Sequence, residues 1–500
     1  MESSEMPDAA AAAIDLDWEF IKAQLPDGWR DLAKEMGLIR PHPPHLGAKI
    51  TDIEQVLRLE LQRVALESSL RITTASSSAA KKIREEDGIA TTEPSAPVDI
   101  AAPSLHEWER KLGPYLATLH AQMASANRVF APELWGGYDL MVADGTTVMR
   151  PGGQYPTARV LYALHLVDMT IPQQQVTDEH GSEGLRKFKV EPGQLWIVDR
   201  YYANPEEVAH VIDAGGELLV RYNRGALPLY DVKGQLIDVM DRVRSLEQPW
   251  AKADWAVWVH PKGHKPILGR LCAMRLPEKE AEKARRWLRR EYGSNVSPET
   301  TEAAQWVMEF VTAPCKRIPL RRVFDLYRLR WQVEIQIHRD KSIGGMNKLP
   351  NFRNDTIATW LHAKLLLQQI VRKIVSPAVV LPEESPALVL PEGPPAVVLP
   401  EEPSAPPPAP PPLWSSTPPP AARSSDVRGP LRLLTHEIVD EMWRMMVFVH
   451  QAVRAALNPI RLRDVPRATA AYLEHLSRQN EQGRPKQIEL LVLEIDPAPS

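Results

Sequence analysis

Residues 327–341 read YRLRWQVEIQIHRDK, a stretch in which polar and apolar side chains recur at helical spacing. Tyr327 is followed at offsets of three, seven and fourteen by Arg330, Glu334 and Lys341. At 100° per residue these four side chains fall within an arc of about 60° on one helix face. A neighbouring face is apolar and would pack on a sheet, through Leu326, Leu329, Val333 and Ile337. We therefore expect one stripe to anchor the helix while the next presents four polar groups to a common space.

The helix itself is expected to run from about Leu320 to Ser342. Pro319 suits its start, where a missing N–H is tolerated, and Gly344 with Gly345 suits its end. The surrounding segment, residues 316–353, is basic, with ten Lys or Arg against three acids. A less specific interpretation of the polar stripe is a solvated face with an intrahelical ion pair between Arg330 and Glu334.

Short apolar runs rich in β-branched and aromatic residues predict strands at 138–143, 158–168, 195–198, 217–222 and 306–312. They begin as a meander and then alternate with helical segments such as 205–214, which indicates a mixed α/β sheet. Residues 231–305 interrupt this pattern and are interpreted as an inserted subdomain. The insertion contains a basic stretch, KARRWLRR, and two tryptophans, Trp255 and Trp258.

The spacing Tyr-x2-Arg-x3-Glu-x6-Lys resembles the signature of the insertion-sequence family 4 transposases, which are DDE transposases with a ribonuclease-H-like core. The resemblance requires one Asp at the end of the first strand, before Gly-Ser/Thr, and another at the end of a later strand, in Asp-Arg-x-Tyr. Asp144 in VADGT and Asp199 in IVDRYY meet both requirements. The similarity covers about residues 135–375, and Tyr201 stands where family members often have Gly.

The resemblance implies an α/β fold: a ribonuclease-H-like mixed sheet flanked by helices, with a β-rich insertion and a helical N-terminal domain. The boundaries expected from the sequence are a helical N-terminal DNA-binding region at 1–125, a catalytic core at 126–230 and 306–375, the insertion at 231–305, a Pro-rich linker at 376–424 and a helical C-terminal region at 425–500.

The N-terminal region is expected to be helical. Thr51 and Glu54 have the spacing of a capping box, and apolar residues from Ile53 to Val64 recur at helical spacing. Two shorter helical segments, at 69–74 and in SSSAAKKIR, could follow as a helix-turn-helix or as part of a plain helical bundle. The sequence leaves these two alternatives open.

The resemblance implies cut-and-paste transposition of an insertion sequence, by phosphodiester hydrolysis and strand transfer at its terminal inverted repeats. Two Mg²⁺ ions, for which Mn²⁺ can substitute, would be held by Asp144 as bridging ligand and by Asp199 and Glu334 as one-metal ligands. Arg330 and Lys341 would bind phosphate. Tyr327 would donate to a phosphate oxygen or pack at the helix–sheet edge.

The expected partners are double-stranded DNA, at the transposon ends and the target, and a second copy of the chain in a homodimer on DNA. The formal net charge is only −4, so DNA binding would depend on local basic surface. A catalytically silent transposon-derived DNA-binding protein is the main alternative, and a general nuclease is a third. The N-terminus lacks the features of a signal peptide and no long apolar run occurs, so a cytoplasmic protein without membrane contact is expected.

Other residues are interpreted structurally. Trp255 and Trp258 favour a core pair on one strand over base stacking. His260 and His264 favour a loop over a metal site. Asp178 and Glu183 are expected to cap a helix and lie in its first turn. The two cysteines, Cys272 and Cys315, are too few for a disulfide framework.

Overall fold

The computed structural model describes residues 18–38, 50, 52–91, 93–126, 137–166, 169–293, 296–349, 354–375 and 436–458. The chain divides into two compact units. The first comprises Met1–Ala23, Asp27–Tyr115 and Gln451–Ser500, and the second comprises Gln24–Pro26 and Leu116–His450. The expected Pro-rich linker at 376–424 and much of the expected C-terminal region at 425–500 lie outside the described residues.

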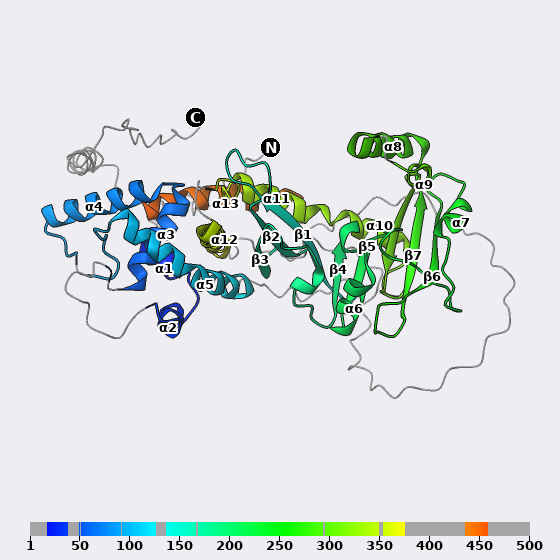
Figure 1. The fold of residues 1–500 in the computed structure, drawn as a ribbon, viewed down its shortest axis with the longest axis horizontal. Helices are drawn as coiled ribbons and strands as arrows, with labels where there is room; N and C mark the ends of the chain where they lie inside the picture. The colour runs from blue at the N-terminus through cyan, green and yellow to red at the C-terminus, as the bar shows by residue number, and fades with distance from the viewer. Residues whose placement is uncertain are drawn as a thin grey trace, which may run out of the picture. The chain divides into compact units, whose positions relative to one another are not determined.

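A mixed sheet of eight strands organises the second unit (Figure 1). The strands lie in the order β3-β2-β1-β4-β5-β8-β7-β6. Their bounds are β1 Asp139–Val148, β2 Ala158–His165, β3 Gln173–Asp178, β4 Gln194–Val198, β5 Glu217–Arg221, β6 Lys252–Val259, β7 Ile267–Arg275 and β8 Trp306–Val311. The first three strands form an antiparallel meander, and β4 and β5 then add in parallel to β1. The mixed α/β class is confirmed, and the arrangement is compatible with a ribonuclease-H-like core.

The apolar residues of the central strands explain why these strands lie in the middle of the sheet. All five residues of β4, QLWIV, are buried, as expected of a strand with both faces covered. Helix α6 (Pro205–Asp213) packs on β5, whereas α11 (Trp331–Ser342) packs on β1 and β2. Helix α10 (Leu320–Arg328) contacts β4, β5 and β8. The sheet is therefore a rigid platform whose middle strands cannot be reached by solvent except at their ends.

The helix expected from Leu320 to Ser342 is not continuous, because α10 ends at Arg328 and α11 begins at Trp331. Between them the Leu329 N–H donates to the Leu326 carbonyl at 3.0 Å, and the Arg330 N–H donates to the Tyr327 carbonyl at 3.1 Å. Bonds to the third preceding residue tighten the turn relative to an α-helix. The expectation of one uninterrupted helix is therefore wrong, since Tyr327 belongs to α10, Arg330 lies at the break, and Glu334 and Lys341 belong to α11.

Residues 231–305 contain β6 and β7 together with three helices, α7 (Val239–Arg244), α8 (Glu278–Tyr292) and α9 (Pro298–Ala303). Both strands belong to the main sheet, because β7 pairs with β8. Trp255 packs against the hydrophobic core, whereas Trp258 is half-buried outside that cluster. The expected core pair is wrong for a geometric reason: residues three apart on a strand point to opposite faces.

The described part of the first unit is helical: α1 (Trp18–Lys22), α2 (Trp29–Glu35), α3 (Ile53–Ala65), α4 (Leu70–Glu86) and the start of α5 (Ala102–Ala126). The cap of α3 lies one residue beyond the expected one. Asp52 accepts from the Glu54 N–H at 2.7 Å, and Gln55 completes the capping box. Glu54 is instead buried, where it accepts from Trp18 Nε1 at 2.7 Å and pairs with Lys22. The two expected short segments after it are the single helix α4.

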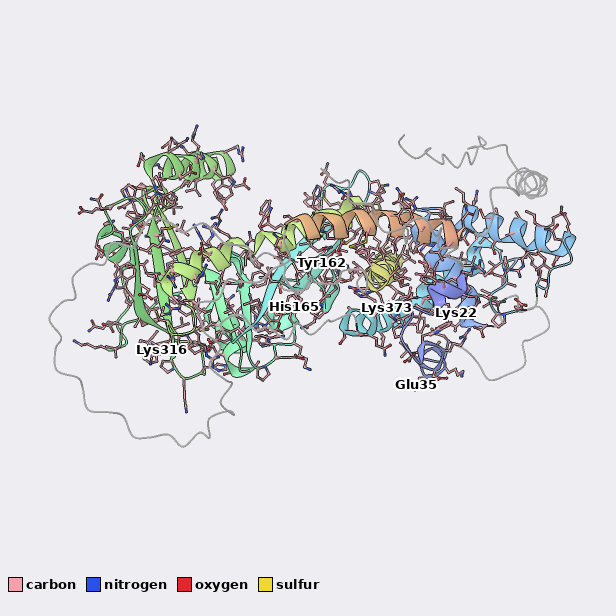
Figure 2. All side chains as sticks on the ribbon, turned by 180° about the vertical axis from the view of Figure 1, so that it is seen from behind. Lys22, Glu35, Tyr162, His165, Lys316 and Lys373 are labelled. Carbon is pink, nitrogen blue, oxygen red and sulfur yellow. The ribbon has the colours of Figure 1, made fainter. Side chains whose placement is uncertain are left out.

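Helix α12 (Asn354–Val375) holds α11 in place through buried polar groups. The Asp340 carboxylate accepts from Arg372 Nη2 at 3.0 Å and from Gln336 Nε2 at 2.7 Å. Tyr162, labelled on β2 in Figure 2, is buried beneath this contact. The last described helix is α13 (His436–Leu457). Among helices in the described ranges, none combines the length and apolar character needed to cross a bilayer.

Candidate active site

Adjacent strands bring Asp144 and Asp199 to one region of the sheet. The parallel ladder between β1 and β4 ends at the pair Val142 and Ile197. Asp199 directly follows the last residue of β4, and Asp144 lies two residues beyond the end of that ladder. Asp144 does not end its strand as expected, because β1 continues to Val148 by pairing with β2.

Helix α11 adds Glu334 and Arg330 to this region. The Arg330 Nη1 lies 3.3 Å from the Asp144 Oδ2, and its Nη2 donates to the Glu334 Oε1. The ion pair between Arg330 and Glu334, which the interpretation as a solvated helix face also predicts, is therefore present. However, the guanidinium is mostly buried and also binds a carboxylate 186 residues away in the sequence. The polar face thus points toward the sheet and not only to solvent.

The electrostatics of the region centre on Asp144. Burial raises the pKa of its carboxyl to about 7. The Gly145 N–H, which donates to it at 2.8 Å, and the Arg330 guanidinium both act to lower that pKa. The negative charges of Asp199 and Glu334 raise it again. Three carboxylates therefore share one neighbourhood with too little positive charge to balance them.

Asp199 is also held by the turn that follows β4. It caps the short 3₁₀ helix η3 (Arg200–Tyr202) and accepts from the Tyr201 N–H at 2.8 Å. Tyr201 does not have a positive φ, so this turn does not require the glycine usual at that position. Tyr202 is buried, and its hydroxyl has no hydrogen-bond partner among the described residues. Burial and then the nearby carboxylates, Glu183 first, raise its pKa strongly.

The remaining two residues of the motif are half-buried. The Arg330 guanidinium lies 5.9 Å from the ring centre of Tyr327. Burial, followed by the charge of Glu309, raises the pKa of the Tyr327 hydroxyl. Burial lowers the pKa of Lys341, and no carboxylate in the described ranges pairs with its ammonium. An unpaired, partly desolvated ammonium is suited to binding an anion.

The three carboxylates supply only oxygen donors, which are the ligands that Mg²⁺ and Mn²⁺ prefer. The shortage of positive charge around Asp144 also fits a cation. Within the described ranges, however, no three acidic, His or Cys side chains lie close enough together to hold a metal ion. Arg330 lies between Asp144 and Glu334, so its guanidinium must move before both carboxylates can bind the same cation.

Glu183 belongs to the same neighbourhood, whereas the sequence interpretation placed it in the first turn of a helix. No α-helix starts there; the segment lies between β3 and the short 3₁₀ helix η2 (Leu185–Lys187). Glu183 Oε1 lies 2.8 Å from Arg159 Nη1, and a Cβ at position 145 would lie 2.7 Å from its Cδ. Burial and, less strongly, the charge of Asp199 raise the pKa of Glu183. The small residue after Asp144 was visible in the sequence, but its long-range neighbour was not.

The other polar candidates lie in ordinary structural contacts. Asp178 is the last residue of β3 and accepts from the His180 N–H at 3.1 Å, so it does not cap a helix. The His260 ring stacks on Tyr230 with centroids 4.2 Å apart. His264 follows in the same loop and pairs with an aspartate. Cys272 is buried and Cys315 is exposed, and both are free thiols.

Comparison with known proteins gives an independent indication. No protein-family profile matches the chain. The transposase InsL of insertion sequence element IS186A from Escherichia coli K12 is 28% identical over 256 residues, which cover 49% of this chain and 68% of InsL. The transposase of insertion sequence element IS421 from Escherichia coli matches to the same extent. This similarity supports an insertion-sequence transposase.

Proposed function

We propose that the chain is a DNA transposase that excises and inserts an insertion sequence by cutting and joining phosphodiester bonds at the terminal inverted repeats. The observation that carries the proposal is the contact of Arg330 with both Asp144 and Glu334. It joins the start of α11, which carries Glu334 and Lys341, to the strand that bears the first aspartate. The similarity to the IS186 and IS421 transposases supports the same reaction class.

In this proposal Asp144, Asp199 and Glu334 hold two Mg²⁺ ions, or Mn²⁺ in their place. Asp144 would be a ligand shared by the two ions, and Asp199 and Glu334 would each hold one of them. When bound, the ions supply activation of the attacking oxygen and stabilisation of the leaving oxygen. The chain contributes by carrying the carboxylates on two hydrogen-bonded strands and one packed helix, and the Arg330 guanidinium would have to leave the space between Asp144 and Glu334.

Arg330, Lys341 and Tyr327 bind the phosphates of the DNA in this proposal. The Arg330 guanidinium leaves its carboxylate partners and binds a phosphate through its fork of donors. Lys341, which has no carboxylate partner in the described ranges, contributes a point charge. The Tyr327 ring lies 5.9 Å from the Arg330 guanidinium, and its hydroxyl donates to a phosphate oxygen in this proposal. Two copies of the chain assemble on the DNA ends.

The decisive experiment is cleavage of a DNA fragment that carries the element's own ends, in Mg²⁺, by wild type and Glu334→Gln. Glu206→Gln, an exposed change of the same kind on α6, is the matched control. We expect double-strand breaks at the ends from wild type and control, and none from Glu334→Gln, which should still bind the ends.

Two results would contradict this proposal. If wild type binds the ends but cuts in neither Mg²⁺ nor Mn²⁺, the chain is a catalytically silent DNA-binding protein. If Glu334→Gln cuts as fast as wild type, the three carboxylates are not the active site. End binding is measured in the same samples, so a loss of folding cannot be mistaken for a loss of chemistry.

A further inference from the structure

Helix α8 carries a row of cations along its outer face. Lys279, Lys283, Arg286 and Arg290 are all exposed. Their offsets of four, seven and eleven residues place them within an arc of about 60°, and the row is about 16 Å long at 1.5 Å per residue. In Figure 1, α8 lies beyond the ends of β6 and β7, as a separate rod next to the sheet.

The opposite face of α8 packs against the rest of the unit, and two of the helix's glutamates form ion pairs with arginines on its side. Ala281 and Leu288 are the buried residues of α8. Glu278 and Glu282 pair with Arg285 and Arg289, which lie on the flank and not in the outer row. Within the row, Lys283 alone has a carboxylate partner among the described residues, Glu280 at 2.8 Å. The outer row therefore keeps most of its positive charge.

An exposed aromatic pair adjoins the row. Trp287 is 46% exposed, and its ring meets Tyr292 edge to face with centroids 6.1 Å apart. About half of the Trp287 surface is therefore open to a partner, next to several cations. Trp and Tyr beside Lys and Arg are typical of surfaces that bind nucleic acid, because the N–H and O–H donate to phosphate and the rings cover sugars.

We propose that α8 lies along the phosphate backbone of duplex DNA and binds it without reading sequence. The inference rests on the proposed function, since it takes DNA as the partner. Successive phosphates advance about 3.4 Å along the duplex axis and lie farther apart along the strand itself, so a row of about 16 Å faces several of them but fewer than five. Four cations in line match such a strand better than they match an acidic protein, whose carboxylates would be more scattered.

The test uses the full chain and a random-sequence duplex of thirty base pairs, with binding followed by fluorescence anisotropy from 50 to 200 mM KCl. The variant replaces Lys279, Arg286 and Arg290 by Gln. Its control replaces three exposed cations of the same unit by Gln, namely Lys233, Arg242 and Lys262. Each lost phosphate contact should lower the slope of log K against log salt by about 0.9.

We expect the α8 variant to lose about two to three units of that slope and tenfold or more in affinity at 50 mM KCl, while the control keeps the wild-type slope. A second variant with Arg286→Lys and Arg290→Lys should retain it, because the charge is preserved. An unchanged slope in the α8 variant, or an equal loss in the control, overturns the inference. If the wild type binds neither the random duplex nor the element ends, the proposed function itself is refuted.

If an acidic protein were the partner, the α8 variant would bind DNA like wild type, and the inference would fail on that result. Melting temperatures of all the variants are compared first. The substituted side chains are exposed and lie away from the buried face of α8, so a common value is expected.

Discussion

Replacing Asp144 by Asn should stabilise the metal-free protein, although it should abolish catalysis. The pKa of Asp144 rises from its ordinary 3.8 to about 7, chiefly because of burial. One pKa unit corresponds to about 1.4 kcal/mol, so ionising this carboxyl in the folded chain costs up to about 4 kcal/mol. Asn keeps the shape and removes the charge.

The measured gain should be smaller than this upper limit. The Asp144 side chain is 17% exposed, and Arg330 loses one of its two carboxylate partners when the charge is removed. We expect the variant to be more stable by roughly 1 to 3 kcal/mol at pH 8 in EDTA. The melting temperature should then rise by several degrees.

The stability difference between Asp144→Asn and wild type should depend on pH. The folded pKa of Asp144 lies above the unfolded one, so the unfolded chain loses this proton first. The free-energy cost of holding an ionised Asp144 in the folded wild type is absent below about pH 4, grows up to about pH 7 and is then constant. The advantage of Asp144→Asn should therefore shrink by roughly half or more between pH 8 and pH 5. Titrating groups that do not interact with Asp144 are common to both proteins and cancel in the difference, whereas Asp199 and Glu334 also respond to the loss of its charge.

Thermal scans of wild type, Asp144→Asn and Asp178→Asn at pH 5 and pH 8 would measure this effect. Asp178 is an exposed aspartate of the same unit, so its variant controls for the chemical change alone. The reasoning would be refuted if Asp144→Asn were less stable than wild type at pH 8. It would also fail if the difference were the same at both pH values.

Further variants test other parts of the structure. Gly344→Ala should destabilise the chain by about 1 to 3 kcal/mol, because its Cβ would lie 1.9 Å from Gln368 Nε2 and 2.7 Å from the Asp340 carbonyl; an unchanged melting temperature would contradict this. Burial lowers the pKa of His362 to about 3, so wild type should lose stability relative to His362→Phe as pH falls below about 6.5; urea denaturation at pH 7 and pH 5 measures it, and a pH-independent difference is the adverse result. Tyr202→Phe removes a buried hydroxyl that lacks a partner among the described residues, so unfolding free energy should stay equal or rise by up to about 1 kcal/mol; a clear loss would show that the hydroxyl is bonded.

The strands could be predicted closely because each is a short apolar run bounded by turn residues. The expected strand at 195–198 is β4, Gln194–Val198, and the one at 217–222 is β5, Glu217–Arg221. Burial on both faces leaves a strong signal in such short segments. The end of β1 could not be predicted from the sequence. Its second half, which begins at Asp144, is polar, and it is a strand only because it pairs with β2.

Contacts between distant segments could not be predicted in the same way. The break between α10 and α11 changes the hydrogen-bond pattern without changing the apolar periodicity, so it leaves no trace in the sequence. The pair of Arg159 and Glu183 joins β2 to a loop after β3. The cap of α3 shifted by one residue because adjacent Thr51 and Asp52 both suit that position.

The continuity of the sheet has a mechanical consequence. Strand β7 leads directly into α8, and β7 is hydrogen-bonded to β8, β8 to β5 and β5 to β4. Beyond the two-residue connection between β7 and α8, each step from β7 to β4 crosses a ladder of backbone hydrogen bonds. A force applied to α8 would therefore be passed through the paired strands to the end of β4, where Asp199 lies. If α8 binds DNA, the distance between that DNA and Asp199 can vary only as far as the β-sheet between them deforms.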